Sequence, residues 1–369
     1  MQKSSTRRAA AFRITRGAAA AATVAALAAT AAHAQVTLSG IADAAVRHVD
    51  NEGRGSARTL ASGSNSTSRL IVRGTEDMGG GLSAGFHLEH GIVLDTGTQA
   101  ASTLFWDRRS TVSLAGRSWG EIRLGRDFVP SYIGWSRYDP FSYVGIGGSN
   151  NLVTATPNGP IRSAFGSGLN TTVRSSNAAQ WLLPSGWGGL EGGVLIAWRE
   201  NGLAADGFHR VRGARLGYTA GRASVSAAYT RTENNLTATG AFEDVSLGGQ
   251  WNGESVRVSA AWRRFHQGSA TQRNTLLGAV MPLGQWELKA SYNRADLSGT
   301  VGTASVGAND ARQLAAGAVY HLSKRSALYG HVSRVDNRGA ATYAIPGGIT
   351  GLAGGASSTG VEFGVRHVF

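Results

Sequence analysis

The sequence predicts an all-β fold, a 16-stranded antiparallel transmembrane β-barrel with one long loop folded into its lumen. Three observations predict it. Segments that alternate apolar and polar residues recur along the chain, as in strands with lipid on one side and water on the other. The N-terminal region has the organisation of an export signal, and no long apolar run follows residue 34. A chain that crosses a membrane without apolar helices must do so as a closed barrel.

We expect residues 1–34 to be a cleaved signal peptide. The first 17 residues carry five basic residues and no acidic one, an Ala-rich run follows, and Ala32-His33-Ala34 precedes the expected cleavage site. This is the order of a secretory signal. The apolar run of about 16 residues is shorter than the roughly 20 that a membrane-spanning helix needs. Residues 35–369 are therefore expected to form a single barrel domain in an exported protein.

The charge of the mature chain gives little support to a nucleic-acid partner. Loss of residues 1–34 removes five positive charges and no negative one, which lowers the formal net charge from +13 to +8. The remaining arginines are scattered singly through the alternating segments and form no basic block. The chain has no cysteine, so it has no disulfide, thiol nucleophile or thiolate metal ligand.

Sixteen segments between turn signals are predicted to be strands. Residues 286–293, W-E-L-K-A-S-Y-N, are representative, with a lipid-compatible face backed by a polar one. Tight turns such as Asn252-Gly253 alternate with longer polar loops, which is the asymmetry of outer-membrane barrels. Sixteen strands leave a water-filled lumen, so the architecture favours a channel. The predicted strands are 35–49, 65–77, 81–94, 103–116, 118–127, 174–184, 188–200, 209–220, 222–232, 242–252, 254–266, 272–282, 285–297, 310–323, 325–336 and 357–369.

The last predicted strand has a particular role in closing the barrel. Its alternation places Val361, Phe363, Val365 and Phe369 on one face, which is the lipid face of a membrane strand. It must pair with the first strand so that neither edge stays open.

Residues 128–173 are too long for a simple connection between strands. A structureless segment of this length usually has a function. Six apolar or aromatic residues near its start could anchor it to the barrel wall: Phe128, Tyr132, Ile133, Trp135, Phe141 and Tyr143. We therefore expect this loop to fold inward and narrow the lumen.

Several segments, in order along the mature chain, resemble the general trimeric porins of Gram-negative outer membranes of the Neisseria and Bordetella type. They are V-T-L-S-G-I-A-D-A-A-V (36–46), S-R-L-I-V-R-G-T-E-D-M-G-G-G-L (68–82), L-D-T-G (94–97), L-G-R-D (124–127), D-P-F (139–141), L-S-K-R-S-A-L-Y (322–329) and G-V-R-H-V-F (364–369). The resemblance implies a homotrimer in the outer membrane, surrounded by lipid and lipopolysaccharide, with passive diffusion of small hydrophilic solutes and often a preference for anions. It also implies that Phe369 is part of a signal for the outer-membrane insertion machinery.

The same resemblance suggests residues for the pore constriction. The family places basic residues on the wall opposite the third loop, and Arg69, Arg108 and Arg174 occupy matching positions. Strand parity adds Arg73, since Arg69 and Arg73 share a face opposite Leu70 and Val72.

Acidic residues are sparse near the predicted constriction. Asp139 is the only acidic residue from 128 to 173, and Asp127 directly precedes the loop. We expect both carboxylates to face the basic wall and the net field to favour anions.

Two other functions were weighed against a general diffusion pore. A substrate-specific channel for organic acids or sugars would be favoured by an aromatic track along the lumen, and none is evident in the sequence. A barrel enzyme needs a nucleophile positioned beside a base, and no motif of that kind accompanies the scattered histidines. His87 and His90 are three residues apart, which on a strand places them on opposite faces and disfavours a metal site. No cofactor is expected.

Overall fold

Sixteen long strands form a single closed antiparallel wall in the computed structural model, which describes residues 35–154, 158–166, 172–199, 209–233 and 240–369. The predicted signal peptide, 1–34, lies outside the described residues. Each predicted strand corresponds to an observed one, although the fourth begins six residues later than expected. The wall strands are β1 (Gln35–Asn51), β3 (Arg69–Gly79), β4 (Leu82–Val93), β6 (Arg109–Gly116), β7 (Gly120–Phe128), β8 (Arg174–Leu182), β9 (Leu190–Ala197), β10 (Arg210–Ala220), β11 (Ala223–Glu233), β12 (Phe242–Asn252), β13 (Arg257–Gln267), β14 (Ala270–Leu283), β15 (Trp286–Ser298), β18 (Ala311–His321), β19 (Ser326–Asn337) and β20 (Ser358–Val368).

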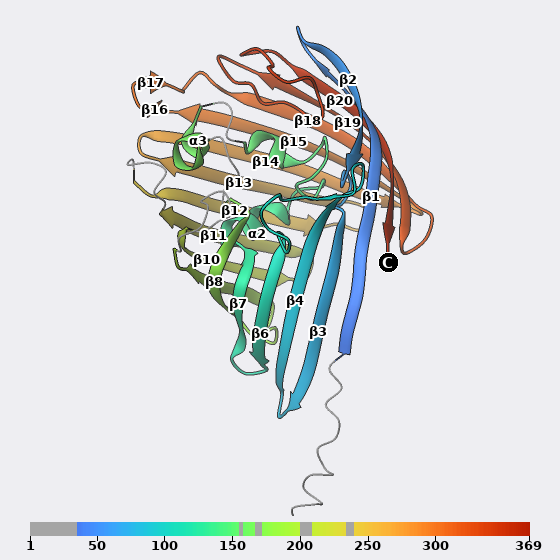
Figure 1. The fold of residues 1–369 in the computed structure, drawn as a ribbon, viewed down its shortest axis with the longest axis vertical. Coiled ribbons are helices and arrows are strands. Elements are labelled where there is room, and N and C mark those ends of the chain that lie inside the picture. The colour runs from blue at the N-terminus through green and yellow to red at the C-terminus, as the bar shows by residue number, and fades with distance from the viewer. Residues whose placement is uncertain (1–34, 155–157, 167–171, 200–208, 234–239) are drawn as a thin grey trace, which may run out of the picture.

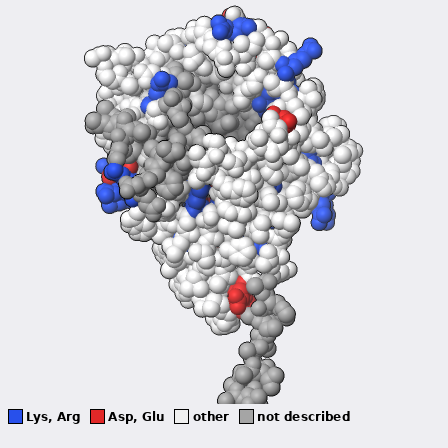
Figure 2. Space-filling view, viewed as in Figure 1, with Lys and Arg blue, Asp and Glu red and all other residues white. Residues whose placement is uncertain are grey.

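The two faces of the wall differ as the alternation predicts. On β15, Trp286 and Leu288 are exposed, whereas Lys289, Ser291 and Asn293 are buried. The apolar side chains that are exposed on the outside of the isolated barrel contact lipid in the membrane. The polar side chains point into the lumen. Figure 2 shows the charged side chains of one face as small separate patches on a largely uncharged surface. This distribution agrees with scattered arginines rather than a basic block.

The barrel closes where the sequence predicts. β20 pairs antiparallel with β1 from Ile41↔Val368 to Asn51↔Ser358, and the backbone of Phe369 exchanges two hydrogen bonds with Gly40. Figure 1 shows the first and last strands side by side. Both edges of the sheet are therefore satisfied.

Four short strands were not predicted. β2 (Gly55–Ser62) pairs with the C-terminal half of β1, while the N-terminal half of β1 pairs with β3. β5 (Thr98–Gln99) pairs with β4, and β16 (Thr300–Val301) and β17 (Ala304–Ser305) form a small hairpin. All four lie in the longer connections at one end of the barrel, so they extend the loops and leave the wall unchanged.

The segment between β7 and β8, residues 128–173, contains three short helices. They are α2 (Pro130–Ser136), the 3-10 helix η1 (Ser149–Leu152) and α3 (Pro160–Phe165). Both α-helices begin with proline, whose fixed φ and missing N–H suit the first turn of a helix. In Figure 1, α2 and α3 lie within the curve of the strands. Among the described residues, no helix is long and apolar enough to cross a membrane.

Candidate functional site

A cavity of about 470 Å³ lies between loop 128–173 and the wall strands that flank it. We call it the central cavity. The wall contributes side chains from β3, β4 and β8, and the loop contributes side chains from α2 and the segment after it. The residues that line it are Ser66, Thr67, Arg69, Glu89, Arg108, Phe128, Tyr132, Ser142, Tyr143, Val144, Asn150, Val173 and Arg174.

Three arginines and one carboxylate gather on the wall side of the central cavity. Glu89 Oε1 lies 2.5 Å from Arg108 Nε and 3.4 Å from Arg69 Nε. Arg174 Nε donates a hydrogen bond of 2.8 Å to the carbonyl of Arg108, and its guanidinium carbon lies 4.6 Å from the centre of the Phe128 ring. With three positive charges and one negative charge, the wall of the cavity is electropositive.

The loop side of the central cavity carries no charged side chain among the described residues that line it. Tyr132 stacks on Phe128 at 5.0 Å between ring centroids and meets Tyr143 edge-on at 5.2 Å. Ser142 and Asn150 add polar groups beside these rings. An ion in the cavity therefore meets guanidinium groups on one side and uncharged polar and aromatic groups on the other.

Loop 128–173 is attached to the opposite wall through a buried ion pair. The Arg263 guanidinium donates two hydrogen bonds, of 2.9 and 2.7 Å, to the carboxylate of Asp244. Neither side chain is more than 2% exposed. Ser131 of α2 donates a 2.7 Å hydrogen bond to Asp244, and Arg263 donates one of 2.8 Å to the carbonyl of Thr172. The pair thus holds the beginning and the end of the loop together.

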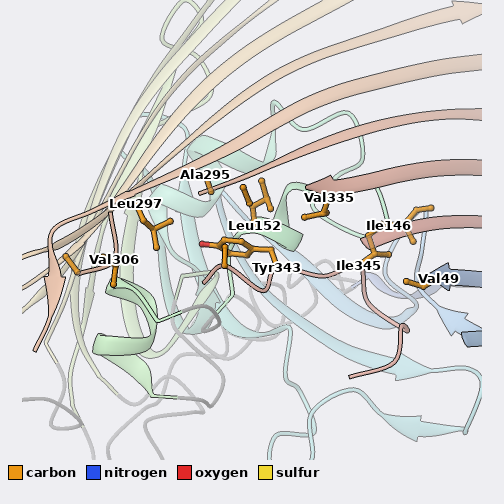
Figure 3. Packing of buried hydrophobic residues seen from close by; sticks show 12 residues of the cluster. Val49, Ile146, Leu152, Ala295, Leu297, Val306, Val335, Tyr343 and Ile345 are labelled. Carbon is orange, nitrogen blue, oxygen red and sulfur yellow. The ribbon is translucent and has the colours of Figure 1, made fainter. Parts of the chain in front are cut away.

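The middle of the loop is held by apolar packing. Trp135 is fully buried, and its indole N–H donates to Ser149 at 2.9 Å. Ile146 and Leu152 belong to a cluster with Tyr343 and Ile345 from the connection between β19 and β20, and Figure 3 shows these side chains packed together. The helices of the loop lie against the wall in order, with α2 on β11 and β12, α3 on β13 and β14, and η1 on β15 and β18.

A second segment, residues 62–68, also reaches the central cavity. Asp43 of β1 accepts hydrogen bonds from the backbone N–H of Ser64 and Ser66 at 3.0 and 2.8 Å, and from the Tyr329 hydroxyl at 2.6 Å. The turn that these bonds stabilise places Ser66 and Thr67 on the cavity lining.

Three of the predicted constriction residues do not line the central cavity. Asp139, which was expected to face the basic wall, is buried inside the loop. Its buried carboxylate accepts hydrogen bonds from the backbone N–H of Phe141, Tyr143 and Ser149 and from the Ser149 hydroxyl. Asp139 therefore stabilises the turn inside the loop.

Asp127 and Arg73 lie on the wall away from the cavity. Asp127 is buried and pairs with Arg123 at 2.7 Å and with Arg109 at 3.5 Å. Arg73 is exposed on β3 and lies four residues closer than Arg69 to the short connection between β3 and β4. The predicted residues that the structure brings together are Arg69, Arg108 and Arg174.

Glu89 was not among the predicted site residues. On β4 it belongs to the water-facing side of an alternating strand, as do many residues of the wall. Its place beside Arg108 follows from the cross-strand register, in which Glu89 pairs with Arg109, and the structure rather than the sequence gives that register. No group of three or more His, Cys, Asp or Glu that could hold a metal ion occurs in the part of the chain that the structure describes.

Comparison with known proteins places the chain in a family. The model of the Gram-negative porin family matches residues 19–340. The chain is 35% identical over 368 residues to outer membrane porin protein 32 of Delftia acidovorans, covering 94% of this chain and 98% of that protein. It is 27% identical over 352 residues to an outer membrane porin protein of Bordetella pertussis, covering 84% of each.

Solved structures agree with this result. An anion-selective porin from Comamonas acidovorans superposes with a TM-score of 0.77 at 33% identity, covering 91% of this chain and 100% of that one. OmpT of Vibrio cholerae, at 11% identity and a TM-score of 0.63, shares the fold. The chain belongs to the Gram-negative porin family, and its barrel is a channel of the outer membrane.

Proposed function

We propose that the central cavity is the constriction of a general diffusion pore that prefers anions. Loop 128–173 narrows the pore at this point. Small hydrophilic solutes and ions would pass without any bond being made or broken. The observation that carries this proposal is the composition of the cavity lining, with Arg69, Arg108 and Arg174 against Glu89 alone. A surplus of positive charge between low-dielectric walls concentrates anions and repels cations.

The loop supports this proposal because it adds no negative charge to the cavity lining. Since its one carboxylate, on Asp139, is buried and engaged in hydrogen bonds, it does not offset the arginines. The porin from Comamonas acidovorans, which is 33% identical to this chain, is anion-selective, and this agrees with the proposed preference. We further propose that the channel works as a homotrimer in contact with lipopolysaccharide.

The test is ion selectivity of an arginine variant against a matched control. Arg108→Ser removes a charge from the cavity, whereas Arg73→Ser removes one from the same lumen wall outside it. We expect the zero-current potential in a salt gradient to shift toward cations for Arg108→Ser and to change much less for Arg73→Ser. Equal shifts in both folded variants would show that net lumen charge, rather than this cavity, sets the selectivity.

A further inference from the structure

Loop 128–173 meets the barrel wall at four positions where the wall strands carry glycine. The contacts follow the order of residues in the loop and fall on every second strand of the wall. We call these four glycines the loop seats. The contacts are Pro130 on Gly213 of β10, Tyr138 on Gly248 of β12, Pro140 on Gly278 of β14 and Phe141 on Gly317 of β18.

The backbone conformation does not require glycine at the loop seats. None of the four glycines has a positive φ, so alanine could adopt the same backbone conformation. Glycine inside a strand weakens the sheet, because it has no side chain to pack and loses more conformational freedom on folding than other residues. Its presence at these positions is explained by the close approach of the loop.

The space above two of the loop seats is filled by rings that cannot turn aside. A Cβ at Gly278 would lie 2.5 and 2.7 Å from two ring carbons of Pro140, and this ring is closed onto the backbone. A Cβ at Gly248 would lie within 3.0 Å of two ring carbons of Tyr138. The Tyr138 side chain is 2% exposed, and its hydroxyl donates a hydrogen bond of 3.1 Å to Ser226. A methyl group at either seat would therefore displace the loop itself.

Each loop seat is paired across strands with a polar residue whose side chain contacts the loop. Ser226, which accepts the hydrogen bond from Tyr138, pairs with Gly248. Ser259 pairs with Gly278 and donates a hydrogen bond of 2.7 Å to the Tyr138 carbonyl. The glycine thus allows the loop to approach, and its neighbour holds the loop at that distance. The other two pairs are Gly213 with Thr230, which accepts a hydrogen bond of 3.2 Å from the Ser131 N–H, and Gly317 with Lys289, whose ammonium lies 4.7 Å from the centre of the Phe141 ring.

The residues that directly follow the last contact line the central cavity. They are Ser142, Tyr143 and Val144. Ser142 and Tyr143 have φ angles of 54° and 65°, so the chain turns sharply at this point, from the wall toward the cavity. The beginning and the end of the loop are held by the ion pair of Arg263 and Asp244. A loop that is lifted from its seats between these fixed ends moves into the cavity.

We propose that the loop seats set the width of the constriction by fixing how closely loop 128–173 lies against the wall. The seats are positioning residues, which control the size of solute that passes and leave the charge of the lining unchanged. The inference rests on the proposed function of the central cavity.

The contact distances give the size of the effect. Carbon atoms in contact are about 3.5 to 4.0 Å apart, so a methyl group 2.5 Å from Pro140 requires the loop to move by about 1 to 1.5 Å. A sphere of 470 Å³ is about 10 Å wide, and a movement of this size removes about 10 to 25% of its cross-section.

The experiment measures two quantities in planar bilayers, the single-channel conductance and the largest neutral polyethylene glycol that enters the pore. The test variant is Gly248→Ala with Gly278→Ala. The control is Gly249→Ala, because Gly249 lies on the opposite face of the same strand and a Cβ there meets its nearest neighbour, the Ser224 carbonyl oxygen, at 3.4 Å. We expect the conductance of the test variant to fall by about 10 to 25%, with a smaller polymer limit, because the pore narrows by that fraction. The control should behave as the unmodified protein does.

A rescue variant separates displacement of the loop from a general loss of stability. Pro140→Ala removes the two ring carbons that a methyl group at Gly278 would meet. Gly278→Ala alone should narrow the pore, and addition of Pro140→Ala should restore the conductance and the polymer limit. An unchanged polymer limit in Gly278→Ala, or a loss that Pro140→Ala does not restore, overturns the proposal. A wider or unsteady channel also overturns it, because the loop would then have left the wall.

Ion selectivity recorded on the same channels separates this inference from the proposed function. No substitution changes a charge, so the zero-current potential should keep its sign in every variant. Cation preference in the unmodified protein contradicts the proposed anion preference and leaves the measurement of pore width valid. A polymer limit that does not respond to the alanines contradicts the role of the loop seats alone.

Discussion

Replacement of Glu89 by Gln is expected to increase the preference of the channel for anions. Glu89 is the one carboxylate that lines the central cavity among the described residues, and Gln keeps the size of the side chain and an oxygen acceptor toward Arg108. The substitution therefore raises the charge of the lining by one unit with little change of shape.

The size of the cavity sets the magnitude of the effect. A sphere of 470 Å³ has a radius of about 4.8 Å, so an ion at its centre is about 6 Å from the carboxylate. At the dielectric constant of water, a unit charge at that distance changes the energy of an ion by about 0.7 kcal/mol. Anion and cation change in opposite directions, which gives up to about a tenfold change in permeability ratio. Screening at about 0.1 M salt lowers this to about fourfold.

The assay is the zero-current potential of the variant in planar bilayers across a salt gradient. Glu121→Gln is the matched control, because Glu121 pairs with Arg123 at 2.9 Å and does not line the cavity. A permeability ratio that stays constant in folded Glu89→Gln, or that rises equally in Glu121→Gln, would refute the assignment of the cavity as the selectivity site.

Three further outcomes are expected. Arg263→Met leaves Asp244 buried without its partner and should destabilise the fold by about 3 to 5 kcal/mol, measured by unfolding in detergent, with noisier single-channel currents because loop 128–173 loses an anchor. Asp139→Asn should leave ion selectivity unchanged, because the carboxylate lies inside the loop, and a shift comparable to that of Glu89→Gln would return Asp139 to the pore lining. Deletion of Phe369 should reduce the yield of assembled protein in the outer membrane more than it changes the conductance of channels that do assemble, since its backbone closes the seam with Gly40.

The wall of the barrel was predictable because its signal is local. Alternation of residues such as Trp286 and Lys289 assigns each side chain to a face without reference to any other strand, and turn residues mark where a strand ends. The four short strands escaped prediction because they lie in long connections. The eight residues of β2, G-S-A-R-T-L-A-S, mix small and polar residues without a strongly apolar face.

The central cavity was predictable only in part, for a physical reason. Parity and resemblance pointed to Arg69, Arg108 and Arg174, but the height of a lumen residue depends on the register between strands, which sequence does not contain. That is why Arg73 lies outside the cavity although it shares a face with Arg69, and why Glu89 was missed. Asp139 was misplaced because its environment depends on the turn of the loop around Ser149.

The most direct test of the account is the zero-current potential of the unmodified, purified channel in a potassium chloride gradient. The surplus of arginine at the central cavity predicts a potential whose sign reports chloride passing more readily than potassium. A potential of the opposite sign, from a folded and conducting preparation, would contradict the claim that Arg69, Arg108 and Arg174 govern which ions cross.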